Sequence, residues 1–373
     1  MTHPAATENT KHSTASGRIL ELDALRGLAA LAVVFFHFTT RYQELFGHRE
    51  SLPLSISWGD YGVNLFFMLS GFVILMTLER TSDSVKFAWG RFTRLYPAYW
   101  AAVVLTFVVV MAFGLSGQQV SIRQAIVNLT MIQSLLGTPH VDGAYWSLQA
   151  ELIFYCNMLL VYRLGAFRWP TATTAIWVSL AAMAVATQSL SEMVSPTTAG
   201  ILSKVVTIAS FKYIAMFGLG ILIYDGRRRT DARITRLLAA GCCLAAIALR
   251  SGTEAMLIDA ALAAILWMAV NGRLAWLNAK WLTFLGAISY TLYLTHQNIG
   301  YIVIRELEDR GVYPIVAIFV AFAVALTMAI GLHRFVERPS LQRLRGVDVS
   351  SILCKTFQRL VPRRPSPTVS TTK

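Results

Sequence analysis

The stretch LRGLAALAVVFFHF, residues 25–38, is a run of apolar side chains with an arginine near one end and a histidine near the other. Arg26 and His37 are 11 residues apart, so on an α-helix they differ by roughly 20° in direction and by about 16 Å along the axis. They therefore share one face, and the small residues beside them allow other helices to approach. Because ionisable groups inside membrane helices are costly and usually functional, the stretch predicts a membrane-spanning helix that carries part of a site.

The composition is that of an integral membrane protein. Of the 373 residues, 55% are hydrophobic and only 14% are charged, whereas a soluble domain has about 25% charged residues. The net charge of +13 is distributed between the apolar runs and in the C-terminal tail, where it sets orientation, which argues against nucleic acid as a partner. The four cysteines have neither a disulfide pattern nor metal-ligand spacing, so no metal site is predicted.

We expect an all-α fold, a polytopic membrane helical bundle with about ten transmembrane helices plus one re-entrant or interfacial helix at 121–137. The predicted spans are 22–40, 59–79, 95–115, 146–164, 171–189, 210–225, 236–250, 254–271, 282–302 and 313–334.

The positive-inside rule predicts the orientation. With the N-terminus in the cytoplasm and ten alternating spans, most of the Lys and Arg residues lie on the cytoplasmic side. Both ends would then be cytoplasmic: a disordered arm at 1–18 and a basic tail at 341–373, on either side of a transmembrane domain at 19–340. The predicted location is the cell inner (plasma) membrane.

Three ionisable residues are predicted at similar depth in the outer half of the bilayer. His37 lies about two-thirds of the way across, and His296 lies roughly 21 Å from the cytoplasmic boundary. Glu151, in YWSLQAELIFY, lies roughly 7 Å below the outer boundary of a core about 30 Å thick. These groups suggest a shared polar cavity, although a hydrogen bond between helices explains an intramembrane histidine such as His296 equally well.

Two arginines follow the second span, in the loop KFAWGRFTRLYPAYW. Arg91 and Arg94 are three residues apart and hence neighbours on one helix face. They are either topology anchors or a phosphate clamp, because paired guanidinium groups bind phosphate oxygens with directed hydrogen bonds. For Asn64 and Ser70 in the second span, helix packing is the favoured interpretation.

Five blocks in order make the chain resemble the acyltransferase 3 family, integral-membrane enzymes that O-acylate carbohydrates and other acceptors. The similarity runs from Leu22 to Pro339, in the blocks LDALRGLAALAVVFFHF, GVNLFFMLSGFVI, FAWGRFTRLYPAYW, YWSLQAELIFY and SYTLYLTH. In one respect the chain departs from the family, since Gln297 and Asn298 follow the late histidine where a proline is often found.

The resemblance implies a donor, acyl-CoA (normally acetyl-CoA), supplied from the cytoplasm. It also implies that Arg26 and His37 are essential, that Arg91 and Arg94 lie on the CoA-binding side, and that Glu151 lies near the reaction centre.

Transfer of an acyl group to a hydroxyl needs a base, and neutral histidine is suited to this near pH 7. We predict His37 as that base, oriented by the carboxylate of Glu151. Transfer is expected to be direct, with an acyl-His37 intermediate as the alternative. Trp146 and His296 are expected to contact the acceptor, a carbohydrate or glycolipid.

Two other classes of protein remain open. A proton-coupled secondary transporter would also place a histidine and a glutamate near the membrane midplane, but no inverted repeat is visible. A binding or scaffold protein is favoured only if Arg26 and His37 prove replaceable.

Overall fold

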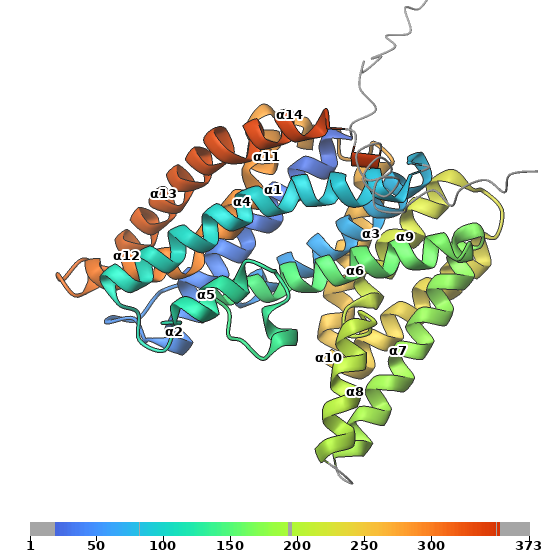
Figure 1. Ribbon diagram of the computed structural model, residues 1–373, viewed down its shortest axis with the longest axis horizontal. Coiled ribbons are helices and arrows are strands. Elements are labelled where there is room, and N and C mark those ends of the chain that lie inside the picture. Colours follow the sequence, from blue (N-terminus) through green and yellow to red (C-terminus); the bar gives the residue numbers. More distant parts are fainter. Residues whose placement is uncertain (1–18, 82, 193–195, 348, 351–373) are drawn as a thin grey trace, which may run out of the picture.

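The computed structural model describes residues 19–81, 83–192, 196–347 and 349–350, which form helices and connecting turns without any strand (Figure 1). The helices are α1 (Leu20–Phe36), α2 (Tyr42–Leu45), α3 (Gly62–Arg80), α4 (Ser84–Phe113), α5 (Ile122–Asn128), α6 (Trp146–Arg163), α7 (Pro170–Glu192), α8 (Pro196–Ile208), α9 (Ile214–Arg228), α10 (Arg233–Val270), α11 (Lys280–Thr295), α12 (Gln297–Glu308), α13 (Pro314–Leu332) and α14 (Arg338–Arg345). The π-helical turns η1 (His37–Arg41) and η7 (His333–Glu337) continue α1 and α13. The predicted arm at 1–18 and the tail from 351 onward lie outside the described residues.

Six helical stretches in the described part of the chain are long and apolar enough to cross a membrane. They are Leu20–Leu45, Ser57–Arg80, Ser84–Phe113, Pro170–Thr187, Arg233–Val270 and Pro314–Arg345. The predicted all-α membrane fold is therefore confirmed, whereas the count of about ten spans stays a prediction.

The third span begins earlier than predicted, at Ser84 rather than at residue 95. Asp83 caps the helix, because its carboxylate accepts hydrogen bonds from the backbone N–H groups of Val85 and Lys86. Arg91 and Arg94 consequently lie on a continuous helix. Their predicted position in a loop is wrong.

The segment 121–137 was predicted not to cross the membrane, and it contains only the seven-residue α5 and a short 3₁₀ turn, which at about 1.5 Å per residue is too short to span a bilayer. Two other features differ from those predicted. An additional helix, α8, lies between the predicted fifth and sixth spans. The predicted span 282–302 is divided at His296 into α11 and α12.

α10 consists of two helical segments joined at Gly252, whose φ of 89° interrupts the helix. Such a φ favours glycine because a Cβ would be strained there. Residues from both segments, among them Arg236 and Trp267, line one cavity. A straight helix would separate these two by roughly 46 Å, so the chain turns back at Gly252, in agreement with the two spans predicted for this region.

Close helix contacts depend on glycine. α1 packs most extensively against α11, where Gly27 meets Gly286 so closely that a Cβ on Gly286 would lie 1.9 Å from the carbonyl oxygen of Asp23. α3 packs against α9 in the same way, through Gly71 and Gly220. These contacts bring α1, α3 and α11 together around the site described below.

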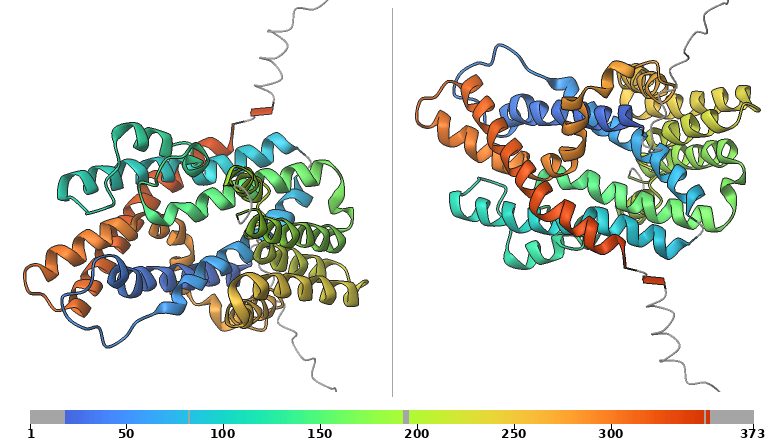
Figure 2. Two further views of the ribbon diagram at one scale, coloured as in Figure 1. Left: turned by 90° about the horizontal axis from the view of Figure 1, so that it is seen from below. Right: turned by 90° about the horizontal axis from the view of Figure 1, so that it is seen from above.

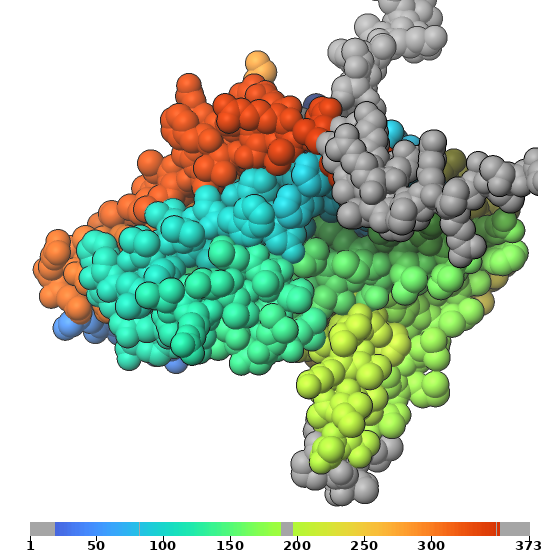
Figure 3. Space-filling view, viewed as in Figure 1, coloured from blue at the N-terminus to red at the C-terminus, as the bar shows by residue number. Residues whose placement is uncertain are grey.

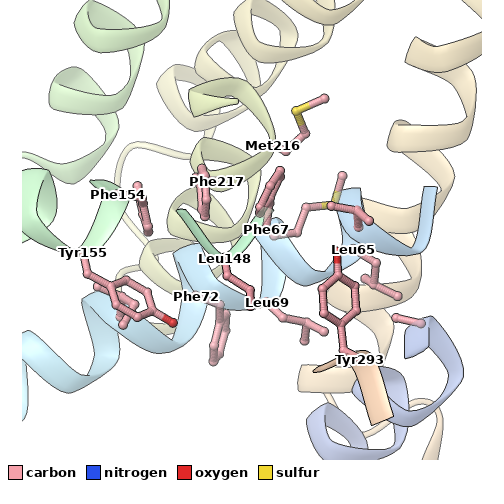
Figure 4. Close-up of a cluster of buried hydrophobic side chains, with 14 of the residues drawn as sticks. Leu65, Phe67, Leu69, Phe72, Leu148, Phe154, Tyr155, Met216, Phe217 and Tyr293 are labelled. Carbon is pink, nitrogen blue, oxygen red and sulfur yellow. The ribbon is translucent and has the colours of Figure 1, made fainter. Parts of the chain in front are cut away.

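Stacked aromatic rings fill the region between α3, α6 and α9 (Figure 4). The ring centroids of Phe154 and Phe217 are 3.7 Å apart, and those of Phe67 and Phe217 are 4.6 Å apart. α7, α8 and part of α10 project from the rest of the molecule as an arm (Figure 3), and α12 and α13 lie at the other end of its long axis (Figures 1 and 2). The site lies between these two parts, against α3.

Candidate active site

An arginine-lined cavity lies between α1, α3, α4, α6 and α11 and encloses about 720 Å³ of space between side chains, including its open mouth. Its lining residues are Arg26, Val63, Phe66, Phe67, Ser70, Arg91, Arg94, Leu95, Ser147, Leu148, Glu151, Tyr155, Ser289, Tyr290 and Tyr293. Three guanidinium groups face one carboxylate here. Arg26 and Arg94 also have carboxylate partners outside this lining, Asp23 at 3.9 Å and Glu337, so Arg91 is the guanidinium without a carboxylate partner among the described residues.

The two arginines of α4 differ in their partners. Arg94 forms a salt bridge of 2.5 Å to the buried carboxylate of Glu337, which also accepts a hydrogen bond from the ring of His333. Arg91 has no carboxylate partner among the described residues, and its buried Nε atom has no hydrogen-bond partner there. Its guanidinium lies over the ring of Tyr155, 5.9 Å from the centroid. Arg91 is therefore the guanidinium that is free to bind an incoming anion.

Glu151 lies in this cavity and does not pair with His37, so the predicted pairing is wrong. The hydroxyl groups of Ser70 and Tyr155 both donate hydrogen bonds to Oε1 of Glu151. Figure 4 shows Tyr155 extending from α6 beside α3. Ser70, for which packing was the favoured interpretation, thus holds the carboxylate. Glu151 opposes the three arginines and limits the positive charge of the cavity.

His37 instead meets His296. Nδ1 of His37 lies 2.8 Å from the carbonyl oxygen of Val33, and Nδ1 of His296 lies 2.8 Å from that of Tyr293. A carbonyl oxygen only accepts, so both Nδ1 atoms carry hydrogen. Nε2 of His296, 3.2 Å from Nδ1 of His37, is then an acceptor. This assignment leaves the lone pair of the half-buried His37 on Nε2, as a general base requires.

The histidine pair adjoins the arginine cavity. Tyr293 lines the cavity, and its ring centroid is 5.5 Å from that of His296. Arg26, on α1 like His37, lines the cavity roughly 16 Å along the helix axis from that histidine. The predicted shared face of α1 therefore runs from the arginine cavity to the histidine pair, and Tyr293 contacts both.

The two residues expected to contact the acyl acceptor, His296 and Trp146, lie just outside the lining of the arginine cavity. His296 is fully buried and contacts His37, so its expected contact with the acyl acceptor stays a prediction. Trp146 lines a second cavity together with Ser134, Gln149, Lys212 and Tyr213. Its ring also packs edge-on against Phe67, a residue of the arginine cavity wall, with the ring centroids 6.2 Å apart.

A buried carboxylate anchors the chain directly after His296. Asp142 accepts hydrogen bonds from the backbone N–H groups of Asn298 and Ala144, both at 3.0 Å. The side chain of Asn298 in turn donates to the carbonyl of Val141. These bonds hold the start of α12, and with it the break in the helix at which His296 stands.

We expect Asp142→Asn to abolish a pH dependence of stability. Burial raises the pKa of Asp142 from 3.8 to about 7. Between these values the folded protein keeps a proton that the unfolded chain has released, so stability falls as pH rises, by at most about 1.4 kcal/mol per pH unit. Melting temperatures in nanodiscs between pH 4.5 and 8 should show this decline only in the wild type. An equal decline in the variant would contradict the assignment.

Sequence reasoning missed the residues that hold the functional groups. Tyr155 follows Glu151 by four residues, which is helical contact spacing and could have indicated the pairing. The bonds of Glu337 to Arg94 and of Asn64 to Asp259 join segments far apart in the sequence, so no local pattern could reveal them.

Comparison with known proteins agrees with this geometry. The family model described as acyltransferase domain, that of the acyltransferase 3 family, matches residues 19–334. A putative acetyltransferase, ORF330, of Acidianus two-tailed virus is 32% identical over 145 residues, which are 39% of this chain and 41% of that protein. The acyltransferase MdmB of Streptomyces mycarofaciens is 32% identical over 159 residues, 39% of this chain and 40% of that protein.

Each of these matches spans about two-fifths of the relative's length. No solved structure matches the chain significantly. The family match covers most of the chain, including the residues of both the arginine cavity and the histidine pair. The chain belongs to the acyltransferase 3 family.

Proposed function

We propose that this protein is a membrane-embedded O-acyltransferase that moves an acyl group, normally acetyl, from acyl-CoA to a hydroxyl of a carbohydrate or lipid-linked sugar. The observation that carries the proposal is the state of His37. Its Nδ1 proton is engaged by the carbonyl of Val33 and by His296, which leaves Nε2 free to accept a proton.

The arginine cavity is the proposed donor site. Its charge suits the phosphates of CoA, and the unpartnered Arg91 is the group that would bind them with directed hydrogen bonds. Arg26 and Arg91 both lie near the starts of their helices, the ends that the proposed topology places at the cytoplasm. We place the enzyme in the inner (plasma) membrane with both termini cytoplasmic, so that the donor enters from the cytoplasm.

The reaction then proceeds by direct transfer. Nε2 of His37 takes the proton of the acceptor hydroxyl while the hydroxyl oxygen attacks the carbonyl carbon of the thioester. The tetrahedral intermediate collapses with cleavage of the C–S bond, and the imidazolium returns its proton to the leaving CoA thiolate. Nε2 of His296 accepts a hydrogen bond from Nδ1 of His37, which orients the His37 ring and stabilises its imidazolium form. Glu151 was expected to fill this role.

Turnover of labelled acetyl-CoA tests this proposal in purified nanodiscs with a mixture of surface glycan and lipid-linked sugar fractions. We expect release of CoA thiol and label in an alkali-labile ester on the acceptor, both absent from His37→Asn. A proton-coupled transporter would instead move a solute into vesicles under a pH gradient without any release of thiol. That outcome would overturn the proposal.

A further inference from the structure

A buried ion pair lies beside the turn that carries His37. His48, in the loop between α2 and the 3₁₀ turn Ser57–Tyr61, has a side chain with no exposed surface. Its Nδ1 atom lies 2.6 Å from Oε1 of Glu308, the last residue of α12, which is 2% exposed. The other carboxylate oxygen of Glu308 accepts the backbone N–H of Arg49. Loop and helix end are thus joined inside the protein.

The second ring nitrogen of His48 also has a partner. Nε2 lies 3.1 Å from the carbonyl oxygen of Phe38, and a carbonyl oxygen can only accept, so Nε2 donates. When Glu308 is ionised, its carboxylate also only accepts, and Nδ1 donates as well. In that state the ring carries a positive charge, and both hydrogen bonds are of the strong charge-assisted type.

The carbonyl that His48 binds belongs to the residue next to the proposed base. Phe38 lies in η1, the π-helical turn that begins at His37. Such turns are rare and need outside support, because the i→i+5 geometry is less favourable than that of an α-helix. The same loop also contacts η1 further along. Ile56 N–H donates to Thr39 Oγ1, and the hydroxyls of Thr40 and Ser55 lie 2.8 Å apart.

We propose that His48, charged and paired with Glu308, is a positioning residue for acyl transfer: it clamps the π-helical turn and so fixes the direction in which Nε2 of His37 points. This inference rests on the proposed function. The clamp holds the backbone directly after His37, while Val33 and His296 hold the ring of His37. Since a misplacement of about 1 Å can cost about 10²-fold in rate, the clamp should affect the chemical step and not donor binding.

Steady-state kinetics of three variants in nanodiscs test the clamp. His48→Phe keeps a ring against Tyr42 but removes both donors, and Glu308→Gln keeps the volume but removes the charge. We expect each to lower kcat about 10–100-fold and to change KM for acyl-CoA by less than about threefold. The double variant should be no worse than the more affected single variant, because all three lose the same interaction.

The matched control is Asp309→Asn. Arg49 and Asp309 form an exposed salt bridge between the same loop and the same helix end, and within the described part of the chain neither side chain forms a hydrogen bond to η1. We expect this variant to keep kcat within about twofold, as exposed ion pairs contribute little. A comparable loss in Asp309→Asn would mean that any loosening of the loop slows the reaction, which would overturn the specific role of His48.

Two further outcomes are decisive. Full kcat in both His48→Phe and Glu308→Gln, with a lowered melting temperature, would make the pair a structural anchor only. If His48→Phe fails to insert into the membrane, Glu308→Gln alone decides. The assay includes His37→Asn: more than about a tenth of wild-type activity in that variant would contradict the proposed role of His37 as the base, whereas an inactive His37→Asn beside fully active His48 variants would contradict only the clamp.

Discussion

Replacement of His37 by asparagine is expected to lower kcat by about 10²–10⁴-fold, the usual loss when a general base is removed. Asparagine offers an N–H group in place of Nδ1, so the bond to the carbonyl of Val33 can persist and the helix should remain folded. It has no basic nitrogen to replace Nε2. The measurement is labelled acetyl transfer at matched protein level, with the melting temperature as a check of folding.

His296→Asn is the companion variant in this experiment. An asparagine oxygen can still accept from Nδ1 of His37, so orientation is partly preserved while the base is untouched. We expect a loss smaller than that of His37→Asn by at least about tenfold. More than about a tenth of wild-type activity in His37→Asn would contradict its assignment as the base. Equal losses in the two variants would mean that the pair acts as one unit.

Arg91→Ala should raise KM for acyl-CoA by about 10–100-fold, because a hydrogen bond to a charged group contributes about 1.5–3 kcal/mol and each 1.4 kcal/mol is a factor of ten. Arg91→Lys should reverse part of the rise in KM, because lysine keeps the positive charge but lacks the planar guanidinium that forms two directed hydrogen bonds. Binding of CoA by calorimetry, at low and at high salt, measures the effect directly. Unchanged binding would make Arg91 a residue that only packs against Phe87 and Tyr155.

Two other arginines serve as references for this experiment. Arg227→Ala removes an exposed guanidinium from α9, outside the cavity, and should leave KM unchanged. Arg94→Ala is a poorer test of the donor site, because it deprives the buried Glu337 of its ion-pair partner and should lower the melting temperature as well. Arg91 has no such partner among the described residues, so its loss should report on ligand binding alone.

The amino-acid sequence was sufficient for the features that depend on local pattern. Long apolar runs predicted the helices, because a bilayer accepts little else. Helical spacing placed Arg26 and His37 on one face of α1, and the order of five short blocks indicated the family that the comparison confirms. The arginines of α4 were also predicted together, since residues three apart on a helix are neighbours whatever the tertiary structure.

Local breaks in the helices were visible only in part. Two separate spans were predicted at 236–250 and 254–271, and the structure turns back between them at Gly252. The break at His296 and the early start of α4 were not. The first depends on the carboxylate of Asp142, which binds Asn298 from 156 residues away, and the second extends an apolar span into a basic segment that resembles a loop.

The partners of the ionisable groups were decided by the tertiary structure alone. Counting residues along a span gives depth in the membrane, but the direction of a side chain around the helix axis depends on how neighbouring helices pack. The predicted depths of His37 and Glu151 suggested a pair, yet the packing of α1 on α11 directs His37 to His296, and that of α6 on α3 directs Glu151 to Ser70. Depth is a property of the sequence, and direction is a property of the packed bundle.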